Sequence, residues 1–313
     1  MRTRHILLPL AALILVAGIA RPGASAQTGN PDPVAQFLEI TPVRQDFTVD
    51  KGQVATKEVT ITNRHVSRIA LKTSFDNLVA SGDQGGTKYT NEPTPWDLKR
   101  YTSVNADEFT LQPRETRKVQ VRIAMTNETA PGGYYGIVRF VPTTSGGEAP
   151  VAIQGQIASL FLVRVPGPTK EEGSIKDLYV TDPDGQRRGR FLFGNDMYLL
   201  TRIHNAGNVH FGTAPNFQLK DVFGKVRHNE QAQPENVFPQ GERRFETRWQ
   251  NAGTGIYTAT VTSTVPGETV ASKTIKVLVV TPVTAAVAGG ILLLLALWLI
   301  SRRNRRKRTK VTI

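Results

Sequence analysis

The chain has 313 residues and no cysteine, which excludes disulfide bonds and any cysteine-based catalytic or metal site. The length allows two domains with cores of their own, and 7% aromatic and 21% charged residues are ordinary for globular protein. The net charge of +13 is concentrated at the ends, because ten Lys and Arg residues and no acid lie before position 27 and after position 300. The rest of the chain carries only about +3, so the basic excess indicates membrane topology and excludes a nucleic-acid-binding surface.

Residues 1–26 have the features of a cleavable signal peptide. A basic start and an apolar run over residues 6–19 precede Ala24-Ser25-Ala26, the small-x-small pattern of a cleavage site. The alternative is an uncleaved anchor, but the apolar run is shorter than the ~20 residues that span a bilayer. We therefore expect cleavage before Gln27, followed by a flexible leader over residues 27–36.

Residues 37–168 are predicted to form a first immunoglobulin-like β-sandwich. Segments such as Glu58–Thr62 and Lys118–Ile123 alternate apolar and polar residues, as half-buried strands do, and turn sequences bound them. The apolar run Gln156–Val165 is the expected last strand, and Pro166-Gly167-Pro168 ends the sheet. No segment of the body has a helical period over three turns, so the predicted fold class is all-β, with antiparallel sandwiches.

Residues 169–280 are predicted to form a second sandwich of the same kind. Its expected strands are Ile175–Thr181, Met197–His204, Phe217–Lys220, Arg244–Trp249, Gly255–Ser263 and Ser272–Val280.

Three features recur in the two predicted sandwiches. Each has a strand that ends in an Asn turn, a Pro-containing turn before a later strand, and a Gly-Tyr strand start. These are Asn63 and Asn205, Pro113 and Pro239, and Gly132-Gly133-Tyr134 and Gly255-Ile256-Tyr257. We expect each tyrosine to place its hydroxyl at a sandwich corner, where it meets a backbone group.

Residues 281–300 are predicted to form a transmembrane helix, with a cytoplasmic tail over residues 301–313. Val283–Ile300 is 18 residues without a charge, and Pro282 fits the first turn of a helix. A buried helix of a globular core does not explain the basic cluster that follows, and a sortase signal lacks its Leu-Pro-x-Thr-Gly-like pentapeptide here. We expect a single-pass protein with its body outside the cell membrane. The predicted anchoring residues at the inner boundary are Trp298, Arg302, Arg303, Arg305 and Arg306.

Three segments of the first module are shared with a known family; they are Leu38-Glu39-Ile40-Thr41-Pro42, Val59-Thr60-Ile61-Thr62-Asn63 and Pro131-Gly132-Gly133-Tyr134-Tyr135-Gly136. In these segments the module resembles the N-terminal domain of the WxL-interacting surface proteins of Gram-positive bacteria. The resemblance implies immunoglobulin-like domains that bind peptidoglycan and a host or partner surface protein. The same turn and strand signatures occur in pilus chaperones, and the second module looks more like a generic cell-adhesion domain.

The sequence contains no recognisable catalytic or metal-binding constellation, so we expect neither enzymatic activity nor a cofactor. His204 and His210 flank a turn, but no His-x-x-x-His or His-Glu spacing accompanies them. Asp182-Pro183-Asp184-Gly185 begins like a calcium loop, yet Phe193 stands where the last acidic ligand belongs.

The stretch from Ser81 to Ser103 is predicted to be a long loop. It is rich in Gly, Thr, Asn and Pro and holds Tyr89, Trp96 and Tyr101, which are the candidate ligand-binding residues. The alternative is that Trp96 folds back over the edge of the sandwich, since large aromatic side chains are usually buried.

Three functional hypotheses follow from the sequence. The first is a cell-surface binding or structural protein whose distal sandwich contacts cell-wall polymer or a partner surface protein. The second is a membrane-tethered chaperone or assembly factor that lends a strand edge to exported proteins. The second predicts a paired basic anchor for a client's carboxyl terminus, for which Arg164 is the candidate. The third is an accessory ectodomain of an enzyme complex.

Overall fold

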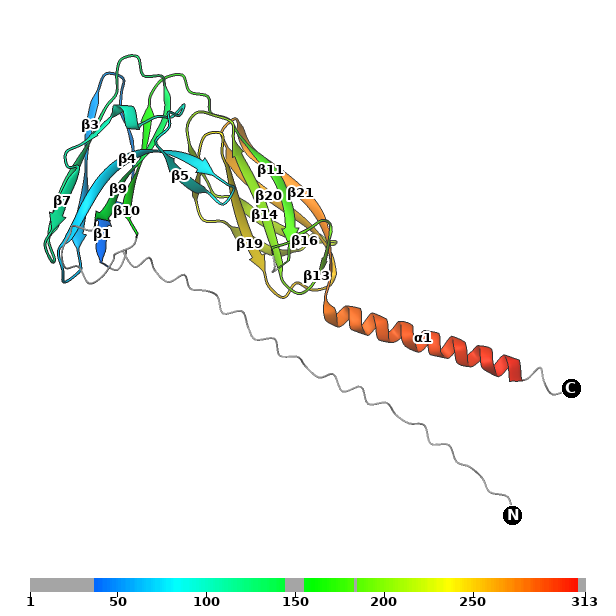
Figure 1. Ribbon diagram of the computed structural model, residues 1–313. Coiled ribbons are helices and arrows are strands. Elements are labelled where there is room, and N and C mark those ends of the chain that lie inside the picture. Colours follow the sequence, from blue (N-terminus) through cyan, green and yellow to red (C-terminus); the bar gives the residue numbers. More distant parts are fainter. Residues whose placement is uncertain (1–36, 144–154, 183–184, 309–313) are drawn as a thin grey trace.

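A computed structural model of the protein describes residues 37–143, 155–182 and 185–308 (Figure 1). The predicted signal peptide and leader, residues 1–36, lie outside the described residues. The described body is built from strands, and its helical parts are a short 3₁₀ turn and one C-terminal helix. The prediction of a mostly β protein with a C-terminal apolar helix is confirmed.

The first sandwich consists of a four-stranded and a six-stranded sheet. The four-stranded sheet has the order β1 (Leu38–Thr41), β3 (Val54–Asn63), β8 (Thr116–Ala124), β6 (Thr102–Val104). The six-stranded sheet has the order β2 (Arg44–Thr48), β10 (Ile157–Val165), β9 (Gly132–Thr143), β4 (Ile69–Ser81), β5 (Gly86–Thr90), and β7 (Glu108–Leu111) also pairs with β4. Alternate residues of the strands, such as Val59, Ile61, Phe140 and Phe161, fill the core, which explains the period of two in the sequence.

The second sandwich has its own core between a four-stranded and a five-stranded sheet. The four-stranded sheet has the order β12 (Arg187–Arg188), β11 (Gly173–Thr181), β14 (Met197–Asn205), β19 (Glu242–Trp249). The five-stranded sheet has the order β13 (Phe191–Phe193), β21 (Glu268–Val280), β20 (Gly255–Val265), β16 (Asn216–Asp221), β17 (Val226–Gln231). A small ribbon of β15 (Phe211–Thr213) and β18 (Glu235–Val237) completes the unit.

The prediction of a long loop from Ser81 to Ser103 is largely wrong. The chain turns after Ser81, returns as β5, forms the 3₁₀ turn η2 (Lys99–Tyr101) and starts β6 within this stretch. Its Gly and Thr residues mark the two ends of a hairpin rather than an irregular loop. β5 pairs with the last part of β4, from Asn77 to Ser81, so the hairpin extends the six-stranded sheet at one corner.

The recurring corners predicted from the sequence are confirmed, and their hydrogen bonds match. The Tyr134 hydroxyl donates to the Ala130 carbonyl at 2.9 Å, and the Tyr257 hydroxyl donates to the Gly253 carbonyl at 3.0 Å, four residues back in both cases. Asn63 and Asn205 are both fully buried. Each accepts the backbone N–H two residues on and donates to the carbonyl four residues on. The two sandwiches therefore repeat one local design.

The chain leaves the second sandwich through α1 (Pro282–Arg308), which follows β21 after a single residue. Within the described part of the chain, α1 alone is long and apolar enough to cross a membrane, over Pro282–Arg303. Figure 1 shows α1 leaving from the end of the second sandwich where β13 and β16 lie.

Candidate functional site

The two sandwiches meet at a junction formed by the ends of β9 and β10 and by the turns at Ala206–His210 and Phe238–Gly241. Asn208 ties the backbones together at this point. Its Oδ1 accepts from the Lys170 N–H at 2.9 Å, its Nδ2 donates to the Pro131 carbonyl at 3.3 Å, and its own carbonyl accepts from the Gly133 N–H at 2.9 Å. Gly132, with φ of 152°, lies so close to Asn208 that a Cβ atom would come within 3.3 Å of it. The junction is thus fixed by backbone contacts and not only by the linker.

An apolar cluster fills the middle of the junction. Leu78, Tyr135 and Leu162 project from the outer face of the six-stranded sheet and are buried. Trp96, Ile137, Leu160 and Phe238 pack against these three side chains, and Phe238 comes from the second sandwich. The Tyr135 and Phe238 rings meet edge to face, with centroids 5.1 Å apart. Because burial of apolar surface is the main favourable term in association, this cluster stabilises one relative placement of the sandwiches.

A buried polar chain runs through the same contact. The His210 N–H donates to the Tyr135 hydroxyl oxygen at 2.7 Å, and that hydroxyl lies 3.1 Å from His210 Nδ1. His210 Nε2 lies 3.1 Å from Asp46 Oδ2 on β2. Burial lowers the pKa of His210 more than the nearby Asp46 carboxylate raises it, and burial also raises the pKa of Tyr135. The arrangement therefore suits a neutral imidazole that accepts from the tyrosine at Nδ1 and donates to Asp46 at Nε2.

The hairpin of β4 and β5 forms a second contact between the sandwiches. Gln84 forms an isolated antiparallel bridge with Arg243 on β19, and the Arg244 N–H donates to the Asp83 carbonyl. Gly85, with φ of 72°, passes so near the Arg243 guanidinium that any Cβ atom would overlap it. The hairpin tip therefore covers part of the otherwise unpaired edge of β19. Figure 1 shows β5 reaching from the first sandwich toward the second.

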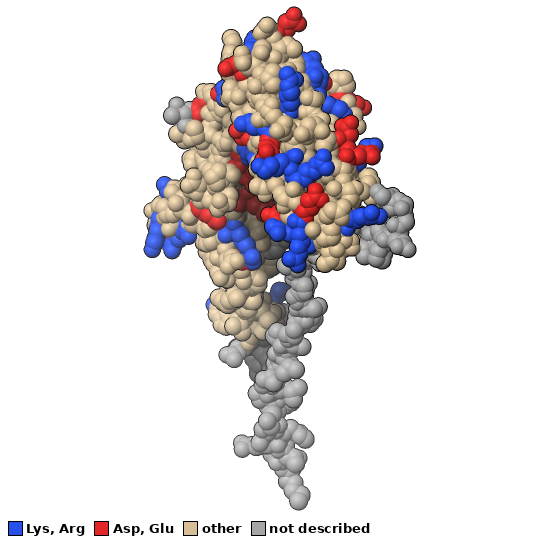
Figure 2. Space-filling model, turned by 90° about the vertical axis from the view of Figure 1, so that its left-hand side faces the viewer, with Lys and Arg blue, Asp and Glu red and all other residues tan. Residues whose placement is uncertain are grey.

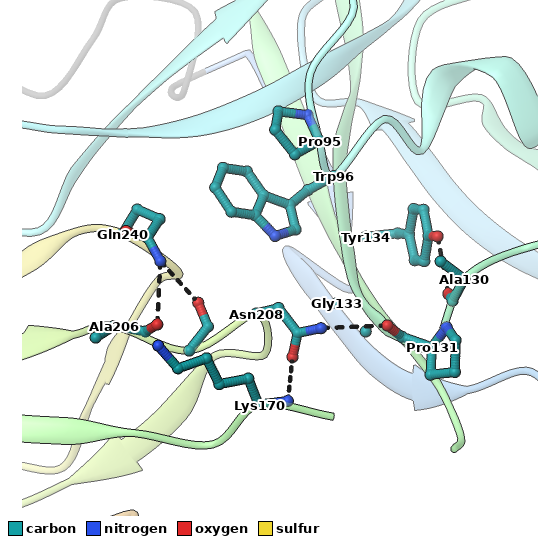
Figure 3. Close-up of a pocket in the computed structure, with 12 residues that line it drawn as sticks. Pro95, Trp96, Ala130, Pro131, Gly133, Tyr134, Lys170, Ala206, Asn208 and Gln240 are labelled. Carbon is teal, nitrogen blue, oxygen red and sulfur yellow. Dashed lines mark hydrogen bonds between the residues drawn. The ribbon is translucent and has the colours of Figure 1, made fainter. Parts of the chain in front are cut away.

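A pocket of about 340 Å³ opens beside this junction (Figure 3). Pro95, Trp96, Pro131 and Tyr134 provide its apolar wall, and Lys170, Asn208 and Gln240 provide polar groups from the other side. The Gln240 amide donates to the carbonyls of Ala206 and Gly207, which holds it in place. Figure 3 shows the Trp96 indole above Asn208, with its nitrogen toward the middle of the pocket. Its size and mixed lining are those of a small side-chain or ligand pocket.

The structure does not bring the three predicted ligand-binding residues together. Trp96 lines the pocket and also packs on the apolar cluster. Tyr101 packs edge to face on Tyr134, which lines the same pocket. Tyr89 lies elsewhere, with its ring 4.0 Å from the guanidinium carbon of Arg139.

Tyr89 covers a buried ionic group that the sequence analysis did not find. Asp76 on β4 has only 2% of its side chain exposed and contacts both Arg139 on β9 and Lys99 of η2. Arg139 Nε donates to Asp76 Oδ2 at 2.8 Å, and Lys99 Nζ lies 3.3 Å from Oδ1. The acid is fully paired, as a buried carboxylate must be. The pairing of β4 with β9 brings Arg139 to Asp76, and η2 brings Lys99 from 23 positions away, so no local sequence signal could have found the group.

The outer edge of β2 is a further feature of the junction. β2 pairs in parallel with β10 alone. The Leu160 N–H donates to the Val43 carbonyl and the Val49 N–H to the Arg164 carbonyl, so the odd-numbered residues of β2 direct their backbone groups to β10. Arg44, Asp46 and Thr48 are exposed and direct theirs away. Within the described residues no hydrogen bond to these three outward backbone N–H and C=O pairs is formed. We call them the β2 edge.

Arg164, the candidate anchor for a client's carboxyl terminus, is already paired. Its guanidinium contacts Glu171, and 43% of its side chain is exposed.

The charged residues on the face drawn in Figure 2 are mixed in sign, with Lys and Arg interspersed with Asp and Glu. Within residues 37–143, 155–182 and 185–308, no group of three or more His, Asp or Glu side chains is placed to hold a metal ion.

At the predicted membrane anchor, the Arg302 guanidinium carbon lies 5.3 Å from the centre of the Trp298 ring, and Arg303 is exposed. The side chains of Arg305 and Arg306 lie outside the described ones.

Comparison with known proteins gives structural matches alone. No family model matches the chain, and no curated protein matches it. The chain is similar to the class 5 fimbriae chaperone CfaA, at 12% identity and a TM-score of 0.42, with 76% of this chain and 98% of that one covered. It is also similar to the E. coli chaperone DraB (13% identity, TM-score 0.35, 77% and 97% covered). A third match is the CsuC–CsuE chaperone–tip adhesion subunit complex of Acinetobacter baumannii (10% identity, TM-score 0.38, 78% and 99% covered).

These findings correct one prediction. The resemblance of the first module to WxL-interacting proteins is wrong: no family model matches the chain, and the similar structures include fimbrial chaperones. The short turn and strand segments that carried it are shared by unrelated β-sandwiches, so they identify the architecture and not the family.

Proposed function

We propose that this protein is a membrane-tethered, non-enzymatic assembly factor that binds an extended segment of another exported protein. The observation that carries the proposal is the β2 edge, a row of unpaired backbone groups on an exposed strand. Such a row is a template for an added strand, which pairs through its main chain and so tolerates many client sequences.

The setting of the edge supports the same function. Asp46 belongs both to the β2 edge and, through His210, to the junction. The two immunoglobulin-like sandwiches are held at a fixed angle there, so the added strand meets a preformed surface and pays little ordering entropy. In the adjoining four-stranded sheet of the second sandwich, the β4–β5 hairpin covers part of the β19 edge, so less of that edge is open to a client.

The client's carboxyl terminus is not what this junction holds. Arg164 is neutralised by Glu171, and Arg44 is paired with Asp46 at 2.8 Å. Recognition by strand addition needs neither cation. The helix α1 keeps the module at the cell membrane, with the sandwiches outside, where exported proteins emerge.

Thr48→Pro tests the proposal, with Thr48→Ala as the matched control. Proline removes the outward Thr48 N–H and places its ring in the path of an added strand, while the bonds from β2 to β10 are kept. Alanine removes only the side chain. The full-length protein, extracted from membranes in mild detergent, is used to capture exported proteins.

We expect the wild type and Thr48→Ala to recover the same client, and Thr48→Pro to recover about tenfold less, the loss of roughly one strong contact. Equal recovery by Thr48→Pro and Thr48→Ala contradicts the proposal. Retention on purified cell wall without a protein client also contradicts it and favours direct binding of the wall polymer.

A further inference from the structure

The second sandwich exposes a group of apolar side chains at the end from which α1 departs. Six residues form it, and between 40% and 91% of each is exposed. We call this group the apolar rim; its members are Phe191, Phe193, Val222, Phe223, Ile256 and Leu278. Soluble surfaces rarely gather three phenylalanines in this way, so the group indicates an interaction surface.

Strand register places four of these residues in one row across the outer face of the five-stranded sheet, and Phe193 lies opposite Val280, two residues nearer α1. Phe191 on β13 is opposite Leu278 on β21, and Leu278 is opposite Ile256 on β20. Asp221 on β16 is opposite Tyr257, so the following Val222 comes level with Ile256. Three strand spacings make the row about 15 Å wide. Phe223 projects from the turn beyond β16 and is 91% exposed.

A row of two lysines lies next to the apolar row, on the side away from α1. Lys276 on β21 and Lys220 on β16 are both opposite Thr258 on β20, two residues further from α1 than Leu278 and Ile256. Two residues of strand correspond to about 7 Å. Both lysines are exposed, and neither forms an ion pair with any residue in the described ranges. Apolar side chains with lysines just behind them match the order of acyl chains and phosphates at a bilayer surface.

The start of α1 determines what covers the rim. The apolar span Pro282–Arg303 has 22 residues, or about 33 Å of helix, against a hydrocarbon core of about 30 Å. A helix that just spans the core places Pro282 at its boundary. The first turn is also tied to the sandwich, because the Thr281 N–H donates to Thr254 Oγ1 at 2.9 Å, next to the start of β20. No linker can therefore lift the apolar rim away from the lipid.

From this geometry we infer that the apolar rim, with Lys220 and Lys276 behind it, is a lipid-binding surface that docks the second sandwich on the outer leaflet of the bilayer. The inference rests on the membrane tether in the proposed function. It gives the second sandwich a fixed orientation on the bilayer, with the aromatic residues in the interfacial layer and the lysines among anionic headgroups.

Single-cysteine labelling tests the inference, because the chain has no cysteine of its own. The full-length protein with Phe223→Cys carries an environment-sensitive dye and is reconstituted into liposomes that contain an anionic phospholipid. The matched control is Val270→Cys, which replaces an exposed residue of β21 about 30 Å from Val280 along the strand. A third protein, Leu294→Cys, reports on α1 itself.

We expect the dye at position 223 to shift to the blue and to be quenched by spin-labelled lipid, while the dye at 270 behaves as in water. If the dye at 294 is quenched but the dye at 223 matches that at 270, the docking surface is wrong and the tether stands. If the dye at 294 is also in water, the tether fails and the docking surface fails with it. The Thr48→Pro capture does not depend on any of these results.

The row of two lysines has its own test in the same liposomes. Changing Lys220→Glu and Lys276→Glu together in the Phe223→Cys protein is expected to reduce the quenching at 223 when anionic lipid is present. In zwitterionic liposomes we expect little change. Equal quenching in anionic liposomes with and without the two changes contradicts the role of the lysines.

Discussion

The outer faces of the two larger sheets differ, although the sandwiches share their corner design. In the first sandwich, Trp96 and the turns of the second sandwich cover part of the outer face of the six-stranded sheet. In the second, the outer face of the five-stranded sheet is exposed and carries the apolar rim. The same local hydrogen bonds therefore build both units, and the exposed faces and edges give each one its own contacts.

The largest expected difference concerns the ionic groups on the two sandwiches. Arg139→Met leaves Asp76 buried with only Lys99 beside it, and we expect a loss of about 3–5 kcal/mol in the free energy of unfolding. Arg202→Met removes the partner of Asp177 in the second sandwich, where both side chains are more exposed, and about 1 kcal/mol is expected. Urea unfolding of the detergent-solubilised protein measures both. Equal losses contradict the contrast between the buried ion pair of the first sandwich and the more exposed pair on the four-stranded sheet of the second.

The paired asparagines test whether the corners are energetically alike. Asn63→Ala and Asn205→Ala each leave buried carbonyls without a donor, so each is expected to lower the free energy of unfolding by about 2–4 kcal/mol. Asn205 also holds the turn that carries Asn208 and His210 into the junction. We therefore expect only Asn205→Ala to increase proteolysis at the linker after Val165. Similar cleavage in both variants contradicts a special role of this corner.

The paired tyrosines provide a smaller version of the same comparison. Tyr134→Phe and Tyr257→Phe each remove one hydrogen bond to a carbonyl four residues back, at a cost of about 1 kcal/mol each. Thermal unfolding is the measurement. If one change leaves the unfolding temperature unaltered while the other lowers it, the two corners do not contribute equally to stability, and the comparison fails.

The smallest expected effect is a pH dependence of the junction. The folded-state pKa of His210 lies below its unfolded value of about 6.5, so the unfolded chain binds the proton first. The contribution of neutral His210 to the stability of the junction is fully present above the pKa of the unfolded chain. It is lost as the pH falls from there through the lower pKa of His210 in the folded protein. We expect proteolysis at the linker to increase over this range in the wild type. His210→Gln, which cannot be protonated, should show a flat profile; the same slope in both proteins contradicts this assignment.

The regular strands and the repeated corners were predictable because they depend on residues close in sequence. Gln156–Val165 differs from β10 by one residue, and the Tyr134 and Tyr257 bonds span four residues. The junction was not predictable, since Asp46 meets His210 across 164 positions. β5 was mistaken for loop because its glycines and threonines resemble a turn, and only pairing with β4 makes it a strand.

Backbone hydrogen exchange along β2 tests the central claim most directly. In the full-length protein alone, the amides of Arg44, Asp46 and Thr48 should exchange rapidly, whereas those of Gln45, Phe47 and Val49 should be protected by β10. Binding of the captured client should slow the first three and leave the others unchanged. Protection of all six in the free protein, or no slowing of the first three on binding, would contradict strand addition at the β2 edge.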